Sequence, residues 1–106
     1  MFYVCAIVHT HDRIDAVVGF DWDDGNRKKC QTHGVTLEEI EAALRGSVNV
    51  FPDPAHSAVE TRYLGIGMTA AGRHLLIAFT RRAIGGQLFI RPISARFYAR
   101  QGDSAL

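Results

Sequence analysis

The side chains with the clearest chemical potential are seven arginines between residues 62 and 100, in a stretch that contains no aspartate or glutamate. The net charge of +1 hides this imbalance, because ten of the eleven acidic residues lie at or before Glu60. The planar, permanently charged guanidinium group is suited to phosphate. The pattern therefore favours a phosphate-binding face, with RNA as the expected ligand. The alternative is that these arginines are solvated or pair with the acids of the first half.

One histidine, His33, is the best candidate for proton transfer, because imidazole is the side chain that titrates nearest to neutral pH. It precedes Gly34 at the end of a predicted helix, where Gly34 can take the left-handed C-terminal conformation. A histidine in the last helical turn also interacts favourably with the negative end of the helix dipole. A purely structural role therefore stays open for His33.

The other histidines and the cysteines give weaker signals. His9, His11 and Asp12 form a string that could place two imidazoles on one side of a strand, but the third or fourth ligand of a metal site is not evident. Cys5 and Cys30 are isolated, with neither a CxxC motif nor a His/Cys ligand spacing. We therefore expect reduced thiols, no metal site and no cofactor.

Three further motifs are interpreted structurally. The glycine-rich stretch 65–72 lacks the Lys-Ser or Lys-Thr pair of a phosphate loop, and we predict a hairpin with a close-packed strand there. His56 and Ser57 follow a proline-rich loop without an evident catalytic partner, and are interpreted as loop surface. Trp22 could stack a nucleic-acid base, and the alternative is a core or capping role beside the first helix.

Length and composition indicate one domain, residues 1–106, with an apolar fraction of 47% that is ordinary for a globular protein. The apolar runs are too short to span a bilayer. The N-terminus also lacks the basic region and cleavage site of a signal peptide. We therefore expect a cytoplasmic protein without membrane contact.

Two short helices are predicted in the first half of the chain. Asp23 can cap a helix that runs to about Thr32, with acids at its start and basic residues further along. Thr36 and Glu39 match a capping box, and apolar residues recur at helical spacing after them until Gly46.

The second half of the chain predicts strands separated by tight turns, after further candidates at 2–8 and 17–22. Turns are expected at Ala71-Gly72 and Gly85-Gly86, and such short connections favour antiparallel pairing. Pro92 places the last strand at an edge or beside a bulge. The expected fold is α+β, with both helices on one face of an antiparallel sheet. The strands of this half are predicted at 48–51, 62–67, 74–82 and 88–94.

Alternation along these strands determines which side chains share a face. Thr80 and Arg82 share a face with Ala78, whereas Arg81 points away. The strands are expected to gather several arginines in one sheet region, where a phosphate would separate their charges: Arg62, Arg81 or Arg82, Arg91 and Arg96.

The order of several segments resembles the BrnT family of type II toxin–antitoxin systems. The resemblance covers residues 20–96, about three quarters of the chain, and leaves residues 1–19 as an atypical N-terminal extension. The segments that carry it are Phe20-Asp21-Trp22-Asp23, His33-Gly34-Val35, Thr36 to Glu39, Phe51-Pro52-Asp53-Pro54, His56-Ser57, Arg62, Ile66-Gly67, Gly72-Arg73, Phe79-Thr80, Arg82 and Ile93-Ser94-Ala95-Arg96.

The resemblance implies a RelE-like fold, an endoribonuclease activity that inhibits translation, and a cognate BrnA-like antitoxin that also binds operator DNA. Metal-independent cleavage by the RNA 2′-hydroxyl needs a base, an acid and positive groups around the phosphate. The residues predicted to be catalytic are His33, Arg62, Thr80, Arg82, Ser94 and Arg96. The residues predicted to bind substrate are Arg81, Arg91 and Trp22.

The chain departs from the family pattern at a few positions. Asn26 and Thr32 stand near places where the family usually has lysine, Pro92 stands where it prefers an aliphatic residue, and 97–106 replaces a charged helix. The alternative function is therefore a catalytically degenerate binding module that pairs with an antitoxin or another partner. A homodimer that uses 2–8 as an exposed edge strand is the third possibility.

Overall fold

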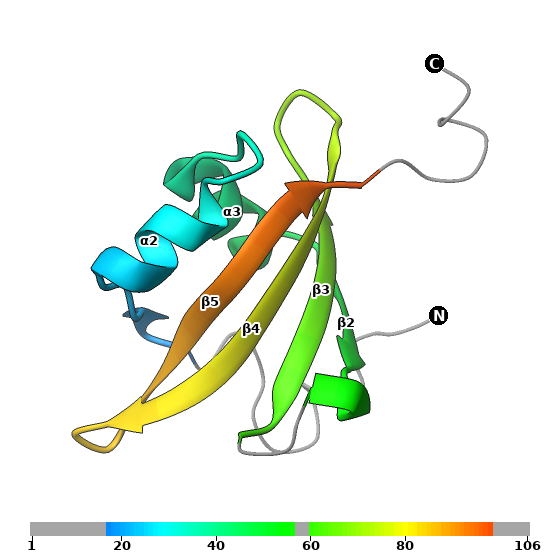
Figure 1. Cartoon of the computed structure of the whole chain (residues 1–106). Helices are drawn as coiled ribbons and strands as arrows, with labels where there is room; N and C mark the ends of the chain where they lie inside the picture. Colours follow the sequence, from blue (N-terminus) through cyan, green and yellow to red (C-terminus); the bar gives the residue numbers. More distant parts are fainter. Residues whose placement is uncertain (1–16, 57–59, 99–106) are drawn as a thin grey trace.

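The fold is a curved five-stranded sheet with two helices, seen in a computed structural model that describes residues 17–56 and 60–98 (Figure 1). The strands lie in the order β1-β5-β4-β3-β2, and all pairs are antiparallel except the parallel pair of β1 with β5. The elements are β1 (Gly19–Phe20), α2 (Asp24–Cys30), α3 (Leu37–Arg45), β2 (Asn49–Pro52), the 3₁₀ turn η2 (Pro54–His56), β3 (Arg62–Met68), β4 (His74–Ile84) and β5 (Gln87–Phe97).

The predicted α+β class is confirmed, with one correction: β1 is parallel to β5, so the sheet is mostly rather than wholly antiparallel. Within the described residues, no helix has the length and apolar character needed to cross a membrane. Several sequence predictions fall outside the described residues: the strand 2–8, Cys5, the string of His9, His11 and Asp12, Ser57, and the chain end after residue 98.

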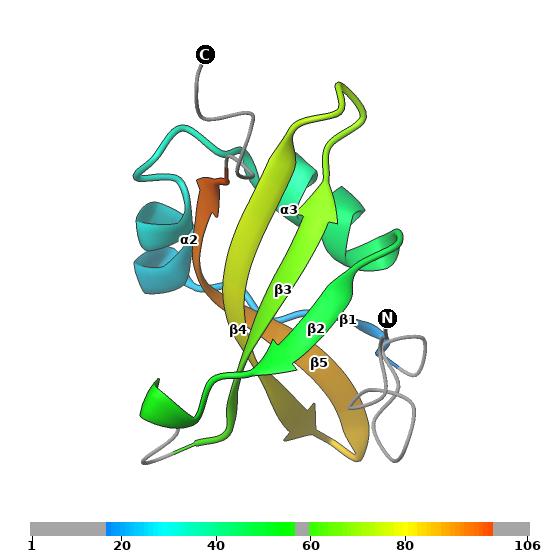
Figure 2. The same cartoon turned by 90° about the vertical axis from the view of Figure 1, so that its right-hand side faces the viewer.

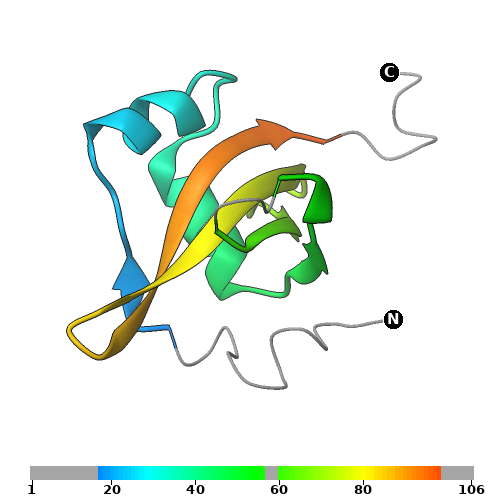
Figure 3. The ribbon, with the colours of Figure 1, turned by 60° about the horizontal axis from the view of Figure 1, so that its bottom comes forward.

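Both helices pack on one side of the sheet and leave the other side open (Figure 2). Helix α3 contacts β3 and β4, whereas α2 lies along β5. Strand β1 is short and pairs with β5 only at Phe89 and Ile90. Burial raises the pKa of Cys30 to about 11, which keeps this free cysteine a protonated thiol. Figure 3 shows η2 on the opposite side of the sheet from α3. The core between sheet and helices contains Val35, Ile40, Leu44, Leu75, Ile77, Phe79 and Ile90.

Both predicted helix starts are confirmed by their caps. The Asp23 side chain accepts from the backbone N–H of Asn26, and the Asn26 side chain accepts from the Asp23 N–H, which completes a capping box. Thr36 and Glu39 form the same reciprocal pair at α3. Helix α2 ends at Cys30, slightly earlier than predicted.

The second predicted helix fits closely against the sheet because β3 carries glycine where α3 crosses it. A Cβ atom on Gly67 would lie 3.2 Å from the carbonyl oxygen of Ala43 and 3.1 Å from its Cβ. This confirms that the glycine-rich stretch forms a close-packed strand and turn rather than a phosphate loop. Helix α3 can therefore lie directly on β3.

The long hairpin of β4 and β5 turns at Gly85 and Gly86, whose φ values of 60° and 80° require the left-handed region that glycine tolerates. Its register shifts at Pro92, which confirms the predicted bulge although β5 lies inside the sheet. The side-chain Nδ2 of Asn26 donates to the Pro92 carbonyl at 2.9 Å. Asn26 of α2 is therefore joined directly to the bulge of β5.

Candidate active site

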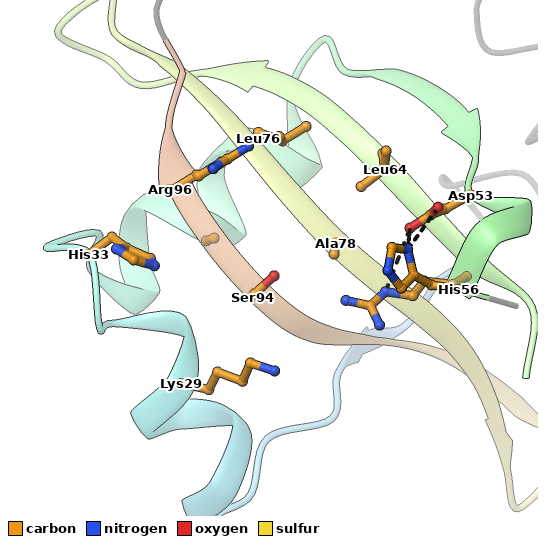
Figure 4. Close-up of a pocket in the computed structure, with 11 residues that line it drawn as sticks. Lys29, His33, Asp53, His56, Leu64, Leu76, Ala78, Ser94 and Arg96 are labelled. Carbon is orange, nitrogen blue, oxygen red and sulfur yellow. Dashed lines mark hydrogen bonds and ion pairs between the residues drawn. The ribbon is translucent and has the colours of Figure 1, made fainter. Parts of the chain in front are cut away.

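A groove of about 450 Å³ lies on the open face of the sheet (Figure 4). Its floor is formed by three apolar side chains from β3 and β4, Leu64, Leu76 and Ala78. One wall comes from the end of α2 and from β5, and the other from the η2 region and the start of β3. The wall residues are Lys29, His33, Asp53, His56, Arg62, Ser94, Ala95 and Arg96.

The first wall is basic. Lys29 is in the last turn of α2, His33 follows in the turn that ends at Gly34, and Arg96 extends from β5. All three are exposed, and none forms an ion pair with the described part of the chain. Gly34 has a φ of 86°, which confirms the predicted left-handed position. This wall can therefore offer two positive charges and an imidazole to a bound anion.

The second wall contains a carboxylate that holds an imidazole. His56 Nδ1 lies 3.2 Å from Asp53 Oδ1 and 3.1 Å from Asp53 Oδ2. Arg62 Nε lies 3.9 Å from the same Oδ2. The sequence interpretation of His56 as loop surface did not include this partner. The sequence did offer one signal: Asp53 and His56 are three residues apart around Pro54, a spacing that a short turn can bring into contact.

Beside the groove, the arginines of the same face are paired with acids. Arg91 Nη2 lies 2.7 Å from Asp23 Oδ2, and Arg91 Nη1 lies 3.5 Å from Asp21 Oδ2. Arg82 Nε lies 3.3 Å from Glu60 Oε2, and its Nη1 lies 3.9 Å from Asp21 Oδ2. The alternative in which arginines pair with acids of the first half therefore holds for Arg82 and Arg91.

The Asp23 carboxylate has a second role in this network as the N-cap of α2. The hydrogen bond from the backbone N–H of Asn26, followed by that from the Arg91 side chain, lowers the pKa of Asp23 below its ordinary value of 3.8. Asp23 is therefore ionised at neutral pH and keeps Arg91 directed toward the start of α2.

Two predicted substrate-binding residues lie away from the groove. Arg81 points to the opposite face, as alternation predicts, and its guanidinium lies 4.6 Å from the centre of the Tyr63 ring and donates to the Tyr63 hydroxyl. Trp22 packs against the core and donates from Nε1 to Glu41 Oε2 at 2.8 Å. Both side chains make contacts that stabilise the fold.

Thr80 lies on the open face but below its surface. It pairs with Arg62 in the register of β3 and β4, and only 4% of its surface is exposed. Its Oγ1 has no hydrogen-bond partner among the described residues. The Thr80 hydroxyl is therefore covered at a point between the groove and the paired arginines.

Of the nine predicted site residues, the groove brings together His33, Arg62, Ser94 and Arg96. Arg82 and Arg91 lie on the same face with carboxylate partners, Thr80 lies beneath that face, and Arg81 and Trp22 lie elsewhere. Three polar groove residues were not selected from the sequence: Lys29, Asp53 and His56.

Comparison with known proteins gives one family. A family model described as the ribonuclease toxin BrnT of type II toxin–antitoxin systems matches residues 22–101. A search of curated proteins found no match. The matched range begins two residues later than the resemblance at 20–96 and ends five residues further on, at residue 101.

Proposed function

Because the chain belongs to the BrnT family of ribonuclease toxins of type II toxin–antitoxin systems, we propose that it cleaves RNA in the groove by metal-independent attack of a 2′-hydroxyl. The observation that carries this proposal is the composition of the groove. It combines exposed positive charge with imidazole over an apolar floor, and RNA supplies the nucleophile itself.

In this reaction a base removes the proton from the 2′-hydroxyl, and the 2′-oxygen forms a bond to phosphorus. The bond from phosphorus to the 5′-oxygen breaks, and an acid protonates that oxygen. The products are a 2′,3′-cyclic phosphate and a 5′-hydroxyl. Positive groups stabilise the charge that accumulates on the phosphoryl oxygens in the transition state.

We assign His33 to proton transfer, as acid or base. Arg96 holds the phosphate from one wall, with Lys29 adding charge and the Ser94 hydroxyl donating a hydrogen bond. Arg62 faces it from the other wall and shares its charge with Asp53, whose Oδ2 lies 3.9 Å from Arg62 Nε. Arg82 and Arg91 would take flanking phosphates only by exchanging their carboxylate partners, and Thr80 supports the face from below. Arg81 and Trp22 have structural roles in this proposal.

A toxin of this family has an antitoxin partner, and we propose that the antitoxin covers the open face. Exposed apolar side chains lie near the groove on this face: Phe51 is paired with Leu64 in register, and Met68 with His74. A segment with apolar and acidic residues would match both the apolar surface and the basic wall. We also propose that RNA cleavage inhibits translation in the cytoplasm.

The test is expression of wild type and His33→Ala, each with and without the neighbouring antitoxin gene. We expect wild type to arrest growth and to generate RNA ends with 2′,3′-cyclic phosphates, and the antitoxin to relieve the arrest. His33→Ala should lower cleavage by about 100-fold or more. Gln31→Ala, an exposed change in the same turn, is the matched control.

Equal arrest by His33→Ala would remove His33 from the mechanism. A stable complex with the antitoxin, without arrest or RNA cleavage by wild type, would instead support the catalytically degenerate binding module.

A further inference from the structure

The groove contains a second imidazole, on the wall opposite His33 (Figure 4). The Asp53 side chain is 13% exposed, whereas the His56 side chain is 64% exposed. The carboxylate is therefore enclosed while the ring remains accessible from the groove.

A short turn fixes the two residues relative to each other. Prolines stand on both sides of Asp53, and their rings restrict the backbone around it. The backbone N–H of Asp53 donates to the Arg62 carbonyl at 2.9 Å, and the N–H of His56 donates to the Asp53 carbonyl at 3.1 Å. These backbone hydrogen bonds hold the turn that carries His56 against the start of β3, so the position of the imidazole is constrained.

The contact with Asp53 determines the tautomer of the ring. An ionised carboxylate can only accept hydrogen bonds, so Nδ1 of His56 carries a proton and donates it to Asp53. In the neutral ring, Nε2 then has the free electron pair that a general base needs. When Nε2 takes a proton, the adjacent carboxylate stabilises the imidazolium, as in other carboxylate–histidine pairs.

We propose that His56 is the general base of RNA cleavage, that Asp53 is its positioning residue, and that His33 is the general acid. This assignment rests on the proposed function and refines it. Nε2 of His56 takes the 2′-hydroxyl proton as the 2′-oxygen bonds to phosphorus. His33 gives a proton to the departing 5′-oxygen as its bond to phosphorus breaks, and Arg62 and Arg96 face the phosphate between them.

Two substrates separate the base from the acid. One is a ribodinucleotide with its natural 5′-nucleoside leaving group, and the other is a nucleoside 3′-(4-nitrophenyl phosphate), whose leaving group needs no proton. His33→Ala should lose about 100-fold or more on the dinucleotide and recover on the nitrophenyl ester. His56→Ala should lose about 100-fold or more on both, because each substrate uses the same 2′-hydroxyl.

Matched variants test the specificity of these effects. His74→Ala removes a histidine of the same face that does not line the groove, and both rates should stay within about twofold of wild type. Asp53→Asn keeps a hydrogen-bond acceptor but removes the charge. We expect it to lower kcat about tenfold with little change in KM. A smaller folded fraction would also lower the apparent kcat, so circular dichroism and the melting temperature must show that Asp53→Asn is folded to the same extent as wild type.

The outcomes are distinguishable. If His56→Ala and His56→Gln, both checked for folding by circular dichroism, match wild type on both substrates, the assignment of the base is wrong although RNA cleavage stands. If His56→Ala regains its activity on the nitrophenyl ester, His56 is the acid rather than the base, and the proposed assignment is overturned. If wild type cleaves neither substrate nor RNA on translating ribosomes, the proposed function itself fails, and this assignment fails with it.

Discussion

The two ends of the open face carry similar positive charge but differ in what surrounds it. At one end, Arg82 and Arg91 contact Asp21, Asp23 and Glu60. At the other end, Lys29 and Arg96 form no ion pair with the described residues and line the groove. A guanidinium can stabilise a phosphate most strongly where no carboxylate competes for it. We therefore expect Arg82 and Arg91 to stabilise the fold, and Lys29 and Arg96 to bind the phosphate of the substrate.

Chain topology produces this difference. The segment that joins β1 to α2 contains Asp21 and Asp23, and the pairing of β1 with Phe89 and Ile90 brings it beside Arg91. Helix α2 then runs along β5 toward Arg96, and its last turn is basic. Acidic residues therefore meet one end of the face, and basic residues meet the other.

The largest expected effect comes from removing one charge at each end. Arg96→Ala should lower kcat/KM about 100-fold, because it removes from the transition-state phosphate a charge that has no ion-pair partner among residues 17–56 and 60–98. Arg82→Ala should lower it by less than about fivefold, because that charge is already balanced by Glu60. Cleavage rates of both folded variants check the comparison. Equal losses would show that the two ends act on RNA together.

The next effect concerns Asn26, which links α2 to the sheet. It lies at the end of the face where Arg82 and Arg91 contact acids, which we call the paired end. Its side chain accepts from the Asp23 N–H at 2.7 Å, and its Nδ2 donates to the carbonyls of Asp21 and Pro92, both at 2.9 Å. Asn26→Ala leaves these groups without their partner, and should lower the free energy of unfolding by about 2 kcal/mol. Chemical denaturation measures this loss.

A control for Asn26→Ala is Thr32→Ala, at an exposed position just after α2, where the Thr32 hydroxyl donates, among the described residues, only to the Lys28 carbonyl, at 3.1 Å. We expect it to change stability by less than about 0.5 kcal/mol. A similar loss in both variants would mean that Asn26 contributes only to the local helix.

Local rules were sufficient for most of the fold. The caps at Asp23 and Thr36, the turn at Gly85-Gly86 and the bulge at Pro92 each follow from a few neighbouring residues. The parallel pairing of β1 was missed because it joins residues about seventy positions apart, and two residues of strand give no pattern that specifies a partner.

The site was less predictable because its charges depend on such distant contacts. The absence of acids between residues 62 and 100 indicated unpaired arginines, but Asp21 and Asp23 reach Arg91 from the first half of the chain. In the sequence, Lys29 has only the pattern of a lysine near a helix end, and its position beside the groove depends on how α2 packs along β5. His56 needed the geometry of η2 to show its carboxylate partner.

A smaller effect is expected at Thr80, between the two ends. Thr80→Val replaces an enclosed hydroxyl, which has no partner among the described residues, with a methyl group of similar shape. It should raise the free energy of unfolding by about 1 kcal/mol and leave the cleavage rate unchanged. Thermal unfolding and a cleavage assay test both expectations. A large loss of activity would instead show that RNA binding exposes this hydroxyl.

The smallest effect is a pH dependence at the paired end. Because folding lowers the pKa of Asp23 below 3.8, its carboxylate contributes stability above that pH, and the contribution disappears as pH falls through the lowered value. Asp23→Asn retains a good N-cap but loses the charge next to Arg91. Wild type should therefore be more stable than Asp23→Asn at pH 7, and the difference between the two melting temperatures should shrink as the pH falls below 3.8. Asp24→Asn, one residue further into the first turn of α2, is the control. If both variants follow the same pH curve, the dipole of α2 rather than the contact with Arg91 accounts for the stabilisation, and the paired end loses its structural assignment.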